Sequence, residues 1–397
     1  RMRIGVYGGT FNPIHRGHLT AARAAADALG LEKVLLIPDN LPPHKELPAG
    51  SATGEDRLAM CRLTAGEVPG MEVLDLELRR SGPSYTSDTL AELHAQYPDD
   101  ELWLLVGSDM FLSLQEWHEP ERILSLAGIA AFHRTRGDET ERFAQQKAYL
   151  EQIYGARVAL LENPDVVEIS STELRAQLAQ GRGRSFLTEA VYGYVLRRGL
   201  YGAHADLKHL TPEELRPIAL SFLKPKRMPH VLGTEHEAAV LARRYGADVT
   251  SARIAALLHD CTKKLSMEEQ LALCEQYGIA LDELERKNLK LLHAKTGAAI
   301  ARDLFGVSDE IYWAIYWHTT GKADMTKLEK VIYLADYIEP SRDFPGVEKL
   351  RRAVHTDLEH GLLMALEDSI EEMRQRGNPV HPTPVEARDY LLRGKNQ

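Results

Sequence analysis

The chain has 397 residues, which is long for one compact domain and suits two domains of about 200 residues each. Hydrophobic residues make up 44% and charged residues 27%, so the composition excludes a disordered or collagen-like chain. No apolar run approaches the ~20 residues of a membrane span, and the first residues lack the apolar core of a signal peptide. With a net charge of −10 and three cysteines without a C-x-x-C spacing, we expect a reduced, cytoplasmic protein that binds neither nucleic acid nor a membrane.

The first half of the sequence alternates short aliphatic runs with helical patterns, which predicts an α/β domain with a parallel sheet over residues 1–203. Strands are expected at residues 3–7, 33–38, 102–106, 128–132, 158–161 and 166–169. Helices are expected between them at residues 17–29, 57–66, 87–96 and 172–178.

The second half shows only helical spacing of apolar residues, which predicts an all-α domain over residues 204–397. Its helices are expected at residues 211–223, 236–245, 251–258, 267–277, 295–305, 308–317, 327–338, 347–359 and 362–377. The first of them has a clear start, because Thr211 can cap the helix, Pro212 suits its first position and Glu213 and Glu214 supply acids in the first turn.

A glycine turn followed by two histidines marks the end of the first strand. Gly8 and Gly9 let the backbone turn sharply and bring its N–H groups close to an anion. His15 and His18 lie three residues apart at the start of a helix, where free N–H groups and the helix dipole favour phosphate. A histidine pair alone is more often structural, but the glycines and the strand-to-helix position together indicate an anion site. The motif is neither a Walker A loop nor G-x-G-x-x-G.

A second helix start adds another anion-binding candidate. Ser170 with Glu173 fits a capping box, which accounts for these two residues without any ligand. It does not account for Arg175, whose guanidinium could clamp phosphate oxygens one turn into the helix. Two anion sites at the strand ends of one parallel sheet suggest a nucleoside triphosphate.

These two motifs resemble the paired signatures of nucleotidyltransferases with a Rossmann-like core and an H-x-G-H motif. Further stretches resemble the bacterial nicotinate-nucleotide adenylyltransferases, and the resemblance extends over residues 3–202. The stretches that carry it are residues 42–45, 84–90, 107–110, 116–118, 191–195 and 200–201. One departure is Pro120, because some members carry a second aromatic residue at that place.

The resemblance implies adenylyl transfer from ATP, with Mg²⁺ on the triphosphate, to nicotinate mononucleotide, with release of pyrophosphate. The residues that it assigns to phosphate stabilisation are His15, His18, Lys45 and Arg175. Those that it assigns to ATP are Gly8, Gly9, Thr10, Phe11, Gly107, Asp109, Ile169, Ser170 and Ser171. Those that it assigns to the nicotinate nucleotide are Thr86, Trp117 and Arg134, with Arg136 as an alternative. Asp109 could instead cap a helix, and the acceptor could be nicotinamide mononucleotide, pantetheine phosphate or another phosphate.

Histidines and aspartates recur along the helical half. The candidates are His230, His259, Asp260, His293, His318 and Asp336. Each alone is more often a satisfied core residue or a helix cap, but Asp336 sits in an apolar run where a carboxylate is costly to bury unless it is paired or binds a metal. Mixed histidine and carboxylate ligands suit Fe, Mn or Zn better than Ca²⁺. The H-E-x-x-H motif of zinc proteases is absent from the sequence.

In this order the residues resemble the HD superfamily of metal-dependent phosphohydrolases. The stretches 226–230, 257–263, 293–298, 317–321 and 328–342 resemble more narrowly the bacterial HD-domain symmetrical bis(5′-nucleosyl)-tetraphosphatases, over residues 207–390.

The second resemblance implies cleavage of diadenosine tetraphosphate into two ADP at a metal site. Its implied metal ligands, for iron or else Mn or Zn, are His230, His259, Asp260 and Asp336. Its implied phosphate contacts are His293, His318, Thr319 and Arg342. Cys261 is expected to point away from the metal. A general nucleotidase, or a non-catalytic nucleotide-binding or oligomerisation module, remains as an alternative, and the sequence leaves a homo-oligomer open.

Overall fold

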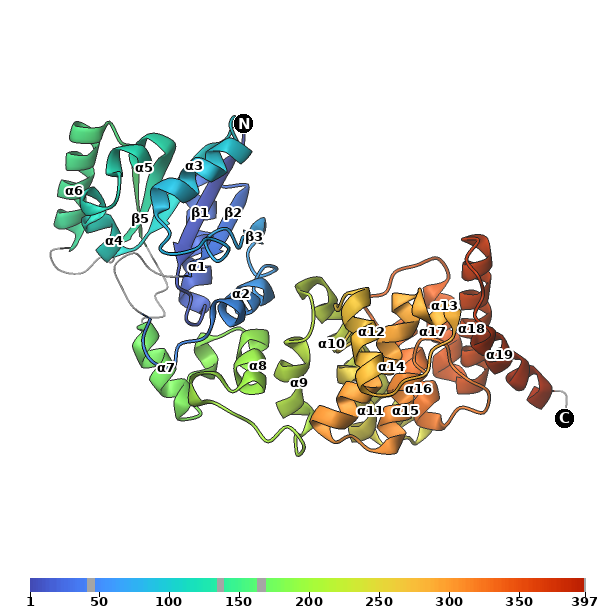
Figure 1. The fold of residues 1–397 in the computed structure, drawn as a ribbon. Coiled ribbons are helices and arrows are strands. Elements are labelled where there is room, and N and C mark those ends of the chain that lie inside the picture. The colour runs from blue at the N-terminus through green and yellow to red at the C-terminus, as the bar shows by residue number, and fades with distance from the viewer. Residues whose placement is uncertain (41–46, 134–138, 163–168, 396–397) are drawn as a thin grey trace. The chain divides into compact units, whose positions relative to one another are not determined.

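The computed structural model describes residues 1–40, 47–133, 139–162 and 169–395, and the chain divides into two compact units, Arg1–His204 and Ala205–Gln397 (Figure 1). The first unit is an α/β domain with a parallel sheet and the second is helical, so the predicted fold class is confirmed. In the described part of the chain, no helix combines the length and apolarity that a bilayer crossing requires.

The sheet of the N-terminal unit is parallel throughout its described pairings, in the order β3-β2-β1-β4-β5-β6. Its strands are β1 (Arg3–Gly9), β2 (Lys33–Pro38), β3 (Met71–Val73), β4 (Glu101–Val106), β5 (Ala127–His133) and β6 (Val158–Glu162). The strand order reverses between β1 and β4, and in such sheets ligands bind at the carboxyl ends beside this point. β3 was not predicted, because three residues carry too little pattern. Of the strand expected at 166–169, only Ile169 is described, and it lies outside any strand.

Helices cover both faces of this sheet. They are α1 (Arg16–Leu29), α2 (Gly54–Leu63), α3 (Thr86–Gln96), α4 (Ser108–Leu112), α5 (Pro120–Leu126), α6 (Glu139–Tyr154), α7 (Ser171–Ala179) and α8 (Glu189–Arg198), with 3-10 turns at Leu114–Glu116, Arg184–Phe186 and Leu200–Gly202. Alternate strand residues such as Ile4 and Leu104 pack with α3 to α6, for example with Leu90 and Phe143. α1 and α2 also pack on the strands.

The C-terminal unit consists of packed helices in its described part. They are α9 (Pro212–Leu220), α10 (Met228–Tyr245), α11 (Val249–Leu258), α12 (Met267–Gln276), α13 (Glu283–Arg286), α14 (Leu289–Phe305), α15 (Asp309–Tyr316), α16 (Lys327–Ile338), α17 (Val347–Thr356), α18 (Leu358–Gln375) and α19 (Pro382–Lys395), with a 3-10 turn at Pro225–Arg227. The predicted start of α9 is confirmed, since Thr211 and Glu214 form a reciprocal capping box. α13 and α19 were not predicted.

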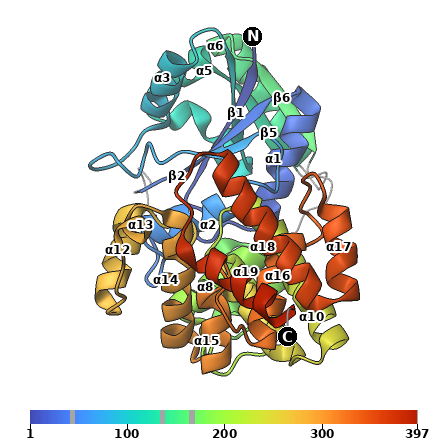
Figure 2. The same ribbon diagram turned by 90° about the vertical axis from the view of Figure 1, so that its right-hand side faces the viewer.

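The centre of this unit is α11, whose residues are apolar on most sides and which packs against α9, α10, α15 and α16. α18 packs on α16, α17 and α19 (Figure 2). The predicted histidines and aspartates lie at the ends of α11 and α15 and on α10, α14 and α16.

Candidate active sites

In the N-terminal unit, the glycine pair of the first motif closes β1 rather than forming the turn after it. Gly8 and Gly9 are the last residues of the strand, and the left-handed φ of 51° falls on Phe11. The expectation that these glycines make the sharp turn is therefore wrong. The missing side chain leaves open space at Gly8, where a Cβ would come no closer than 3.9 Å to the Ile37 carbonyl oxygen, whereas at Gly9 it makes room for the Phe11 ring, which would lie 3.2 Å from a Cβ.

His15 and His18 cap the N-terminus of α1 with their rings. Nδ1 of His15 accepts a hydrogen bond from the backbone N–H of Gly17 (3.0 Å), and Nδ1 of His18 accepts one from the backbone N–H of His15 (3.1 Å). A neutral ring that accepts at Nδ1 carries its proton at Nε2. Burial lowers the pKa of His15 to about 4, and burial together with the nearby His15 lowers the pKa of His18 well below its usual value. Both rings are therefore neutral at physiological pH, each with an Nε2–H donor.

Arg175 joins the second predicted motif to the first. Its Nη1 atom donates to the carbonyl oxygen of Asn12 (2.9 Å), which lies 163 positions earlier in the chain. Ser170 is the N-cap of α7, and its Oγ accepts the backbone N–H of Glu173 (3.1 Å), which is one half of the predicted capping box. The start of α7 thus lies beside the turn that leads to His15.

Two buried side chains hold this turn in place: Arg57, which no motif marked, and Asn12, which belongs to the turn itself. Arg57 is 1% exposed, and its Nη1 donates to the carbonyl oxygen of Thr10 (2.8 Å). The side-chain oxygen of Asn12 accepts the hydroxyl of Tyr201 (2.8 Å), and its amide nitrogen donates to Ser51 Oγ (2.8 Å). Arg57 is invisible to local sequence patterns, because it bonds to a turn that lies 47 positions earlier in the chain.

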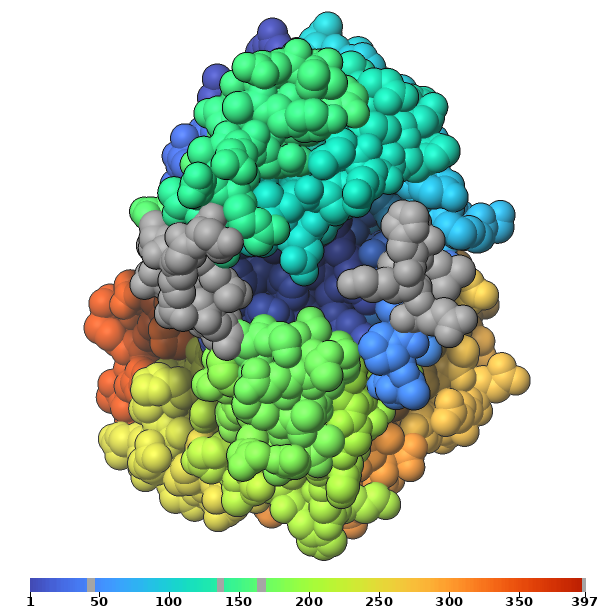
Figure 3. All heavy atoms as spheres, turned by 90° about the vertical axis from the view of Figure 1, so that its left-hand side faces the viewer, coloured from blue at the N-terminus to red at the C-terminus, as the bar shows by residue number. Residues whose placement is uncertain are grey.

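A cavity of about 330 Å³ opens over the glycines and is lined by both residues expected at the pyridine ring, Thr86 and Trp117. Figure 3 shows this side of the unit as a hollow whose floor is the N-terminal segment in dark blue. Gly8, Gly9 and Thr10 belong to the same lining. The structure therefore brings the predicted nicotinate wall and the phosphate turn together.

Ser84 and Glu77 also line this cavity, although neither was predicted as a site residue. Ser84 is 4% exposed, and its Oγ has no hydrogen-bond partner among the described residues. Burial raises the pKa of Glu77 to about 7, against the lowering effect of a hydrogen bond from Thr89. An unpaired buried hydroxyl in a cavity wall indicates a place where a ligand binds.

The other predicted residues of this unit are placed as follows. Gly107 is the N-cap of α4, and the N-terminus of this helix has no side-chain cap. Asp109 is exposed in the first turn of the same helix. Ile169 directly precedes the N-cap of α7, and Ser171 is the first residue of that helix. Lys45, Arg134 and Arg136 lie outside the described residues, so their roles stay predictions.

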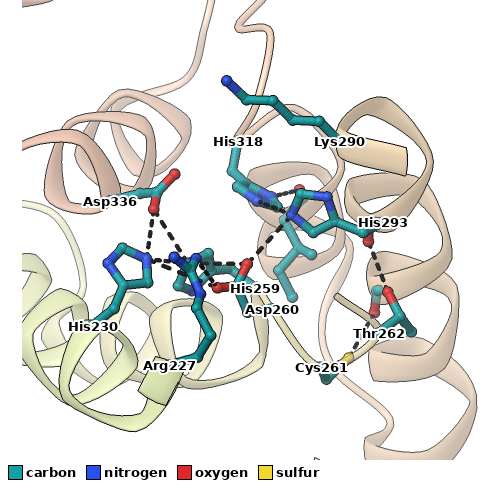
Figure 4. A network of polar contacts seen from close by, with 12 residues as sticks. Arg227, His230, His259, Asp260, Cys261, Thr262, Lys290, His293, His318 and Asp336 are labelled. Atoms are coloured by element: carbon teal, nitrogen blue, oxygen red, sulfur yellow. Dashed lines mark hydrogen bonds and ion pairs between the residues drawn. The ribbon is translucent and has the colours of Figure 1, made fainter. Parts of the chain in front are cut away.

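In the C-terminal unit, all the predicted histidine and aspartate side chains meet at one point (Figure 4). Nε2 of His230 lies 2.8 Å from Oδ1 of Asp336 and 3.3 Å from Nε2 of His259. Nε2 of His293 lies 3.3 Å from Oδ1 of Asp260 and 3.2 Å from Nε2 of His318. Three overlapping groups of these atoms are close enough to share a cation: His230, His259 and Asp260; His259, His318 and Asp336; Asp260, His293 and His318.

Hydrogen bonds behind the rings fix which nitrogen faces the centre. Nδ1 of His230 contacts the Glu339 carboxylate (2.6 Å), and Nδ1 of His259 and of His318 contacts the carbonyl oxygen three residues earlier (2.5 and 2.6 Å). These oxygens only accept, so each Nδ1 carries a proton and each neutral ring turns an Nε2 lone pair inward. Lone pairs 3.3 Å apart on His230 and His259 repel each other unless a cation lies between them. The donor set therefore fits a metal ion that takes both nitrogen and oxygen ligands.

The electrostatics of the cluster agree with this fit. Burial alone would lower the pKa of His259, but Asp260 and Asp336 outweigh it and raise that pKa to about 9, so the carboxylates favour positive charge at this ring, which a proton on Nε2 or a bound cation can supply. Burial alone would raise the pKa of both aspartates, yet contacts with the histidines hold each well below its usual value. Two ionised carboxylates at one centre, Asp260 buried and Asp336 half-buried, attract positive charge.

Glu339 and Gly233 support the cluster, and neither was predicted to do so. Glu339 is fully buried, and although burial raises its pKa, hydrogen bonds from His230 and Ser341 outweigh this and keep the pKa below its usual value. A Cβ placed on Gly233 would lie 2.6 Å from Oε1 of Glu339, so the glycine lets α10 approach this carboxylate. Glu339 and His230 are 109 positions apart, beyond the reach of any local pattern.

The loop after α16 is held by Arg351 of α17. This guanidinium donates to the carbonyl oxygens of Ile338, Glu339 and Arg342 (2.8 Å each). Arg342 in turn lies with Nη2 3.3 Å from Oδ1 of Asp336. The predicted phosphate contact Arg342 is thus positioned at the cluster by a residue that sequence reasoning missed.

His293 differs from the other three rings. It is 3% exposed, and its Nδ1 atom finds no hydrogen-bond partner in the part of the chain that the structure describes. Because His318 presents a lone pair, the 3.2 Å contact between the two rings makes His293 Nε2 the donor. The Cys261 thiol donates to the Gly297 carbonyl (3.6 Å) away from the cluster, as predicted (Figure 4).

A cavity of about 800 Å³ opens from the cluster to α18. Its lining includes Thr319 and Arg342, both predicted to contact phosphate, together with the basic side chains of Lys226, Arg227 and Lys290. Arg227 also binds the cluster directly, with Nη2 2.5 Å from Oδ2 of Asp260. An anionic ligand that reaches the metal group would therefore pass basic residues.

Comparisons with known proteins assign each unit to a class. A cytidylyltransferase-like family model matches residues 6–177, and an HD domain model matches residues 227–341. The protein thus combines a nucleotidyltransferase-type unit with a helical HD domain.

Two curated relatives narrow the first class. Proteins named probable nicotinate-nucleotide adenylyltransferase from Desulfatibacillum aliphaticivorans and Gloeobacter violaceus are 41% and 39% identical to the chain over 218 and 205 residues. The matches cover 50% and 51% of this chain and 100% and 98% of those proteins. Through its N-terminal half, the chain belongs to the nicotinate-nucleotide adenylyltransferase family.

Two solved structures are also similar. One, from Clostridium acetobutylicum, is described as a predicted HD superfamily hydrolase involved in NAD metabolism; it is 38% identical, with 47% of this chain and 98% of that chain covered and a TM-score of 0.45. The other is the Plasmodium falciparum nicotinic acid mononucleotide adenylyltransferase complexed with NaAD, at 18% identity, 51% and 98% coverage and a TM-score of 0.42.

Proposed function

We propose that the chain is a bifunctional enzyme. Its N-terminal unit transfers the adenylyl group of ATP to nicotinate mononucleotide, and its C-terminal unit hydrolyses diadenosine tetraphosphate to two ADP. The family membership of the N-terminal half and the class of the C-terminal domain support the two halves of the proposal separately.

The contact between Arg175 and Asn12 carries the first half of the proposal. It brings the guanidinium and the start of α7 beside the turn that ends at His15, so two anion-binding elements serve one substrate. A nucleotide at the carboxyl ends of β1 and β4 then lies between these elements and the cavity lined by Thr86 and Trp117.

In the transfer, an oxygen of the nicotinate mononucleotide 5′-phosphate attacks the α-phosphorus of MgATP. The new P–O bond forms as the bond to the β-phosphate oxygen breaks, and pyrophosphate leaves. The chemistry needs positioning and charge neutralisation more than covalent help. Because they are neutral and carry their protons at Nε2, His15 and His18 donate hydrogen bonds to phosphate oxygens, while Arg175 and Lys45 supply positive charge.

The inward-facing nitrogens of His230 and His259 carry the second half of the proposal. With Asp260 and Asp336 they would hold a divalent metal, for which we propose iron. When bound, such a metal polarises phosphate oxygens and makes water more acidic. Arg342 and Thr319 would hold the phosphate chain beside it.

In the hydrolysis, water adds to one of the two inner phosphorus atoms of diadenosine tetraphosphate. The bridging P–O bond between the inner phosphates breaks, so one ADP keeps the water oxygen and the other leaves. We assign protonation of the leaving ADP to His293, because its Nε2–H faces the cluster, while its Nδ1 atom, which has no hydrogen-bond partner among the described residues, can take up a proton in exchange. The proton that the attacking water loses replaces the one that the leaving oxygen gains.

The test uses the purified, iron-loaded chain in two reactions resolved by chromatography. ATP with nicotinate mononucleotide should give nicotinate adenine dinucleotide and pyrophosphate, and much less product with nicotinamide mononucleotide. Diadenosine tetraphosphate should give ADP as sole product. AMP with ATP would exclude symmetrical cleavage, faster release of phosphate from AMP or ADP would indicate a general nucleotidase, and binding without cleavage would indicate a non-catalytic module.

A further inference from the structure

The N-terminal site binds the reacting phosphates and the pyridine ring with different groups. His15 and His18 present Nε2–H donors at the start of α1, and the Arg175 guanidinium lies beside the turn that precedes them. None of these three residues belongs to the described lining of the cavity that contains Thr86 and Trp117. The groups that neutralise the phosphates therefore cannot distinguish between acceptors that differ only in the body attached to the phosphate.

The reaction requires a terminal phosphate group on the acceptor. Nicotinate mononucleotide carries this group as its 5′-phosphate, and ATP carries the same group as its γ-phosphate. When a second ATP is the acceptor, one oxygen of its γ-phosphate bonds to the α-phosphorus of the first ATP, and the bond from that phosphorus to the β-phosphate oxygen breaks. Pyrophosphate leaves, and four phosphates then join the two nucleosides. The step has the same in-line geometry as the first transfer and needs no further reactant.

An aromatic pair at the mouth of the cavity suits the base of such an acceptor. His118 belongs to the cavity lining although its side chain is 49% exposed, so its ring lies where the cavity meets solvent. The ring stacks on Tyr85, with 4.2 Å between the ring centroids and 31° between the planes. Because ATP has two more phosphates between its attacking group and its ribose than nicotinate mononucleotide has, its base extends farther from the reacting atoms. Exposed aromatic rings bind bases by stacking on them.

We propose that the N-terminal unit also joins two ATP molecules into diadenosine tetraphosphate, with the base of the acceptor ATP stacked on His118. The product is the substrate that we assign to the C-terminal unit, which hydrolyses it to two ADP. This inference rests on the proposed function of both units and adds a reaction that links them. The transferase supplies the substrate of the hydrolase, and the hydrolase removes a side product of the transferase.

The test is mass spectrometry of the products that the full chain forms from MgATP alone. The chain is first freed of its resident metal with a chelator, so that hydrolysis stops and the product of the transfer accumulates. Diadenosine tetraphosphate and pyrophosphate should form in equal amounts, and added Fe²⁺ should convert each diadenosine tetraphosphate into two ADP. Nicotinate mononucleotide should suppress this product and give nicotinate adenine dinucleotide instead, because both acceptors need their phosphate at the same point.

Substitutions assign the product to this site. His18→Ala should slow both transfers by the same factor, about 10²–10³-fold, because both use its donor. His118→Ala should slow the formation of diadenosine tetraphosphate about tenfold, the cost of one lost base stack, and should slow the formation of nicotinate adenine dinucleotide much less. His118→Phe keeps a ring for the base and should restore the first rate. His94→Ala, which removes an exposed histidine of α3, is the matched control and should change neither rate.

Formation of nicotinate adenine dinucleotide without diadenosine tetraphosphate would overturn the inference and leave the proposed transfer intact. Diadenosine tetraphosphate that forms at the wild-type rate with His18→Ala would overturn its assignment to this site, and equal effects of His118→Ala on both products would overturn the stacked base. If diadenosine tetraphosphate accumulates and persists after Fe²⁺ is added, the second transfer stands and the proposed hydrolase function fails.

Discussion

In the N-terminal site His15 and His18 accept hydrogen bonds at Nδ1, whereas in the C-terminal site His259 and His318 donate from Nδ1. The difference follows from the helix end behind each ring. The start of α1 offers backbone N–H groups, and the ends of α11 and α15 offer carbonyl oxygens.

Histidine therefore suits ligands of opposite charge in the two sites. A ring held by an N–H turns an Nε2–H donor outward, which suits phosphate, and a ring held by a carbonyl turns a lone pair outward, which suits a cation. The contrast extends to charge, because burial lowers the pKa of His15, while two carboxylates raise the pKa of His259 and so favour positive charge, from a proton or a bound cation, at its Nε2. The largest effects should come from variants that abolish one of these arrangements.

Asp260→Asn should abolish hydrolysis of diadenosine tetraphosphate and metal retention. The change removes the charge of the buried Asp260 carboxylate, one of two aspartates at the cluster, so the loss should exceed the roughly 10–100-fold seen when a residue that only orients a ligand is replaced. Metal content by atomic emission and ADP release by chromatography measure it. Adenylyl transfer by the same sample is the internal control and should stay at the wild-type rate; its loss would mean that the two sites are coupled.

His18→Ala should slow adenylyl transfer by about 10²–10³-fold, the usual cost of removing one fixed donor to a charged transition state. Initial rates of pyrophosphate release report the effect. His94→Ala, which removes an exposed histidine of α3, is the matched control. Equal, small effects of both substitutions would show that the His18 ring serves only to cap α1.

Gly233→Ala should weaken metal binding by about 10–100-fold through displacement of Glu339 from His230. Competition with a chromogenic chelator measures the affinity. Gly394→Ala in α19 is the matched control, since a Cβ there meets no described atom within 4 Å. Unchanged affinity in Gly233→Ala would mean that Glu339 does not orient the ring.

Glu77→Gln should change stability in a pH-dependent way in the N-terminal unit. The pKa of the Glu77 carboxyl is about 7 in the folded protein and 4.5 in an ordinary glutamate. Between these pH values the folded state binds more protons than the unfolded state, so the free energy of unfolding of the wild type falls as pH rises. The variant should match the wild type near pH 4.5 and exceed it by about 2–3 kcal/mol at pH 8. Denaturant titrations at both pH values measure this, with exposed Glu67→Gln as control; a pH-independent difference would contradict it.

The sequence was most informative where chemistry depends on neighbours along the chain. His15 with His18, and His259 with Asp260, are local motifs, and the structure places each pair at a helix end as such motifs require. The tautomers were not predictable, because they depend on the backbone groups behind each ring. Arg57, Gly233, Glu339 and Arg351 were missed because each acts on a group that is distant in the chain or lies in a loop without periodicity.

The most direct test of the contrast is removal of the resident metal from one sample that is then assayed for both reactions. The chain is treated with a chelator, freed of it and given only MgATP with nicotinate mononucleotide or diadenosine tetraphosphate. We expect adenylyl transfer to persist and hydrolysis to vanish, with hydrolysis restored by Fe²⁺. Loss of both reactions, or hydrolysis that survives without the metal, would contradict the assignment of protein donors to the first site and a cation to the second.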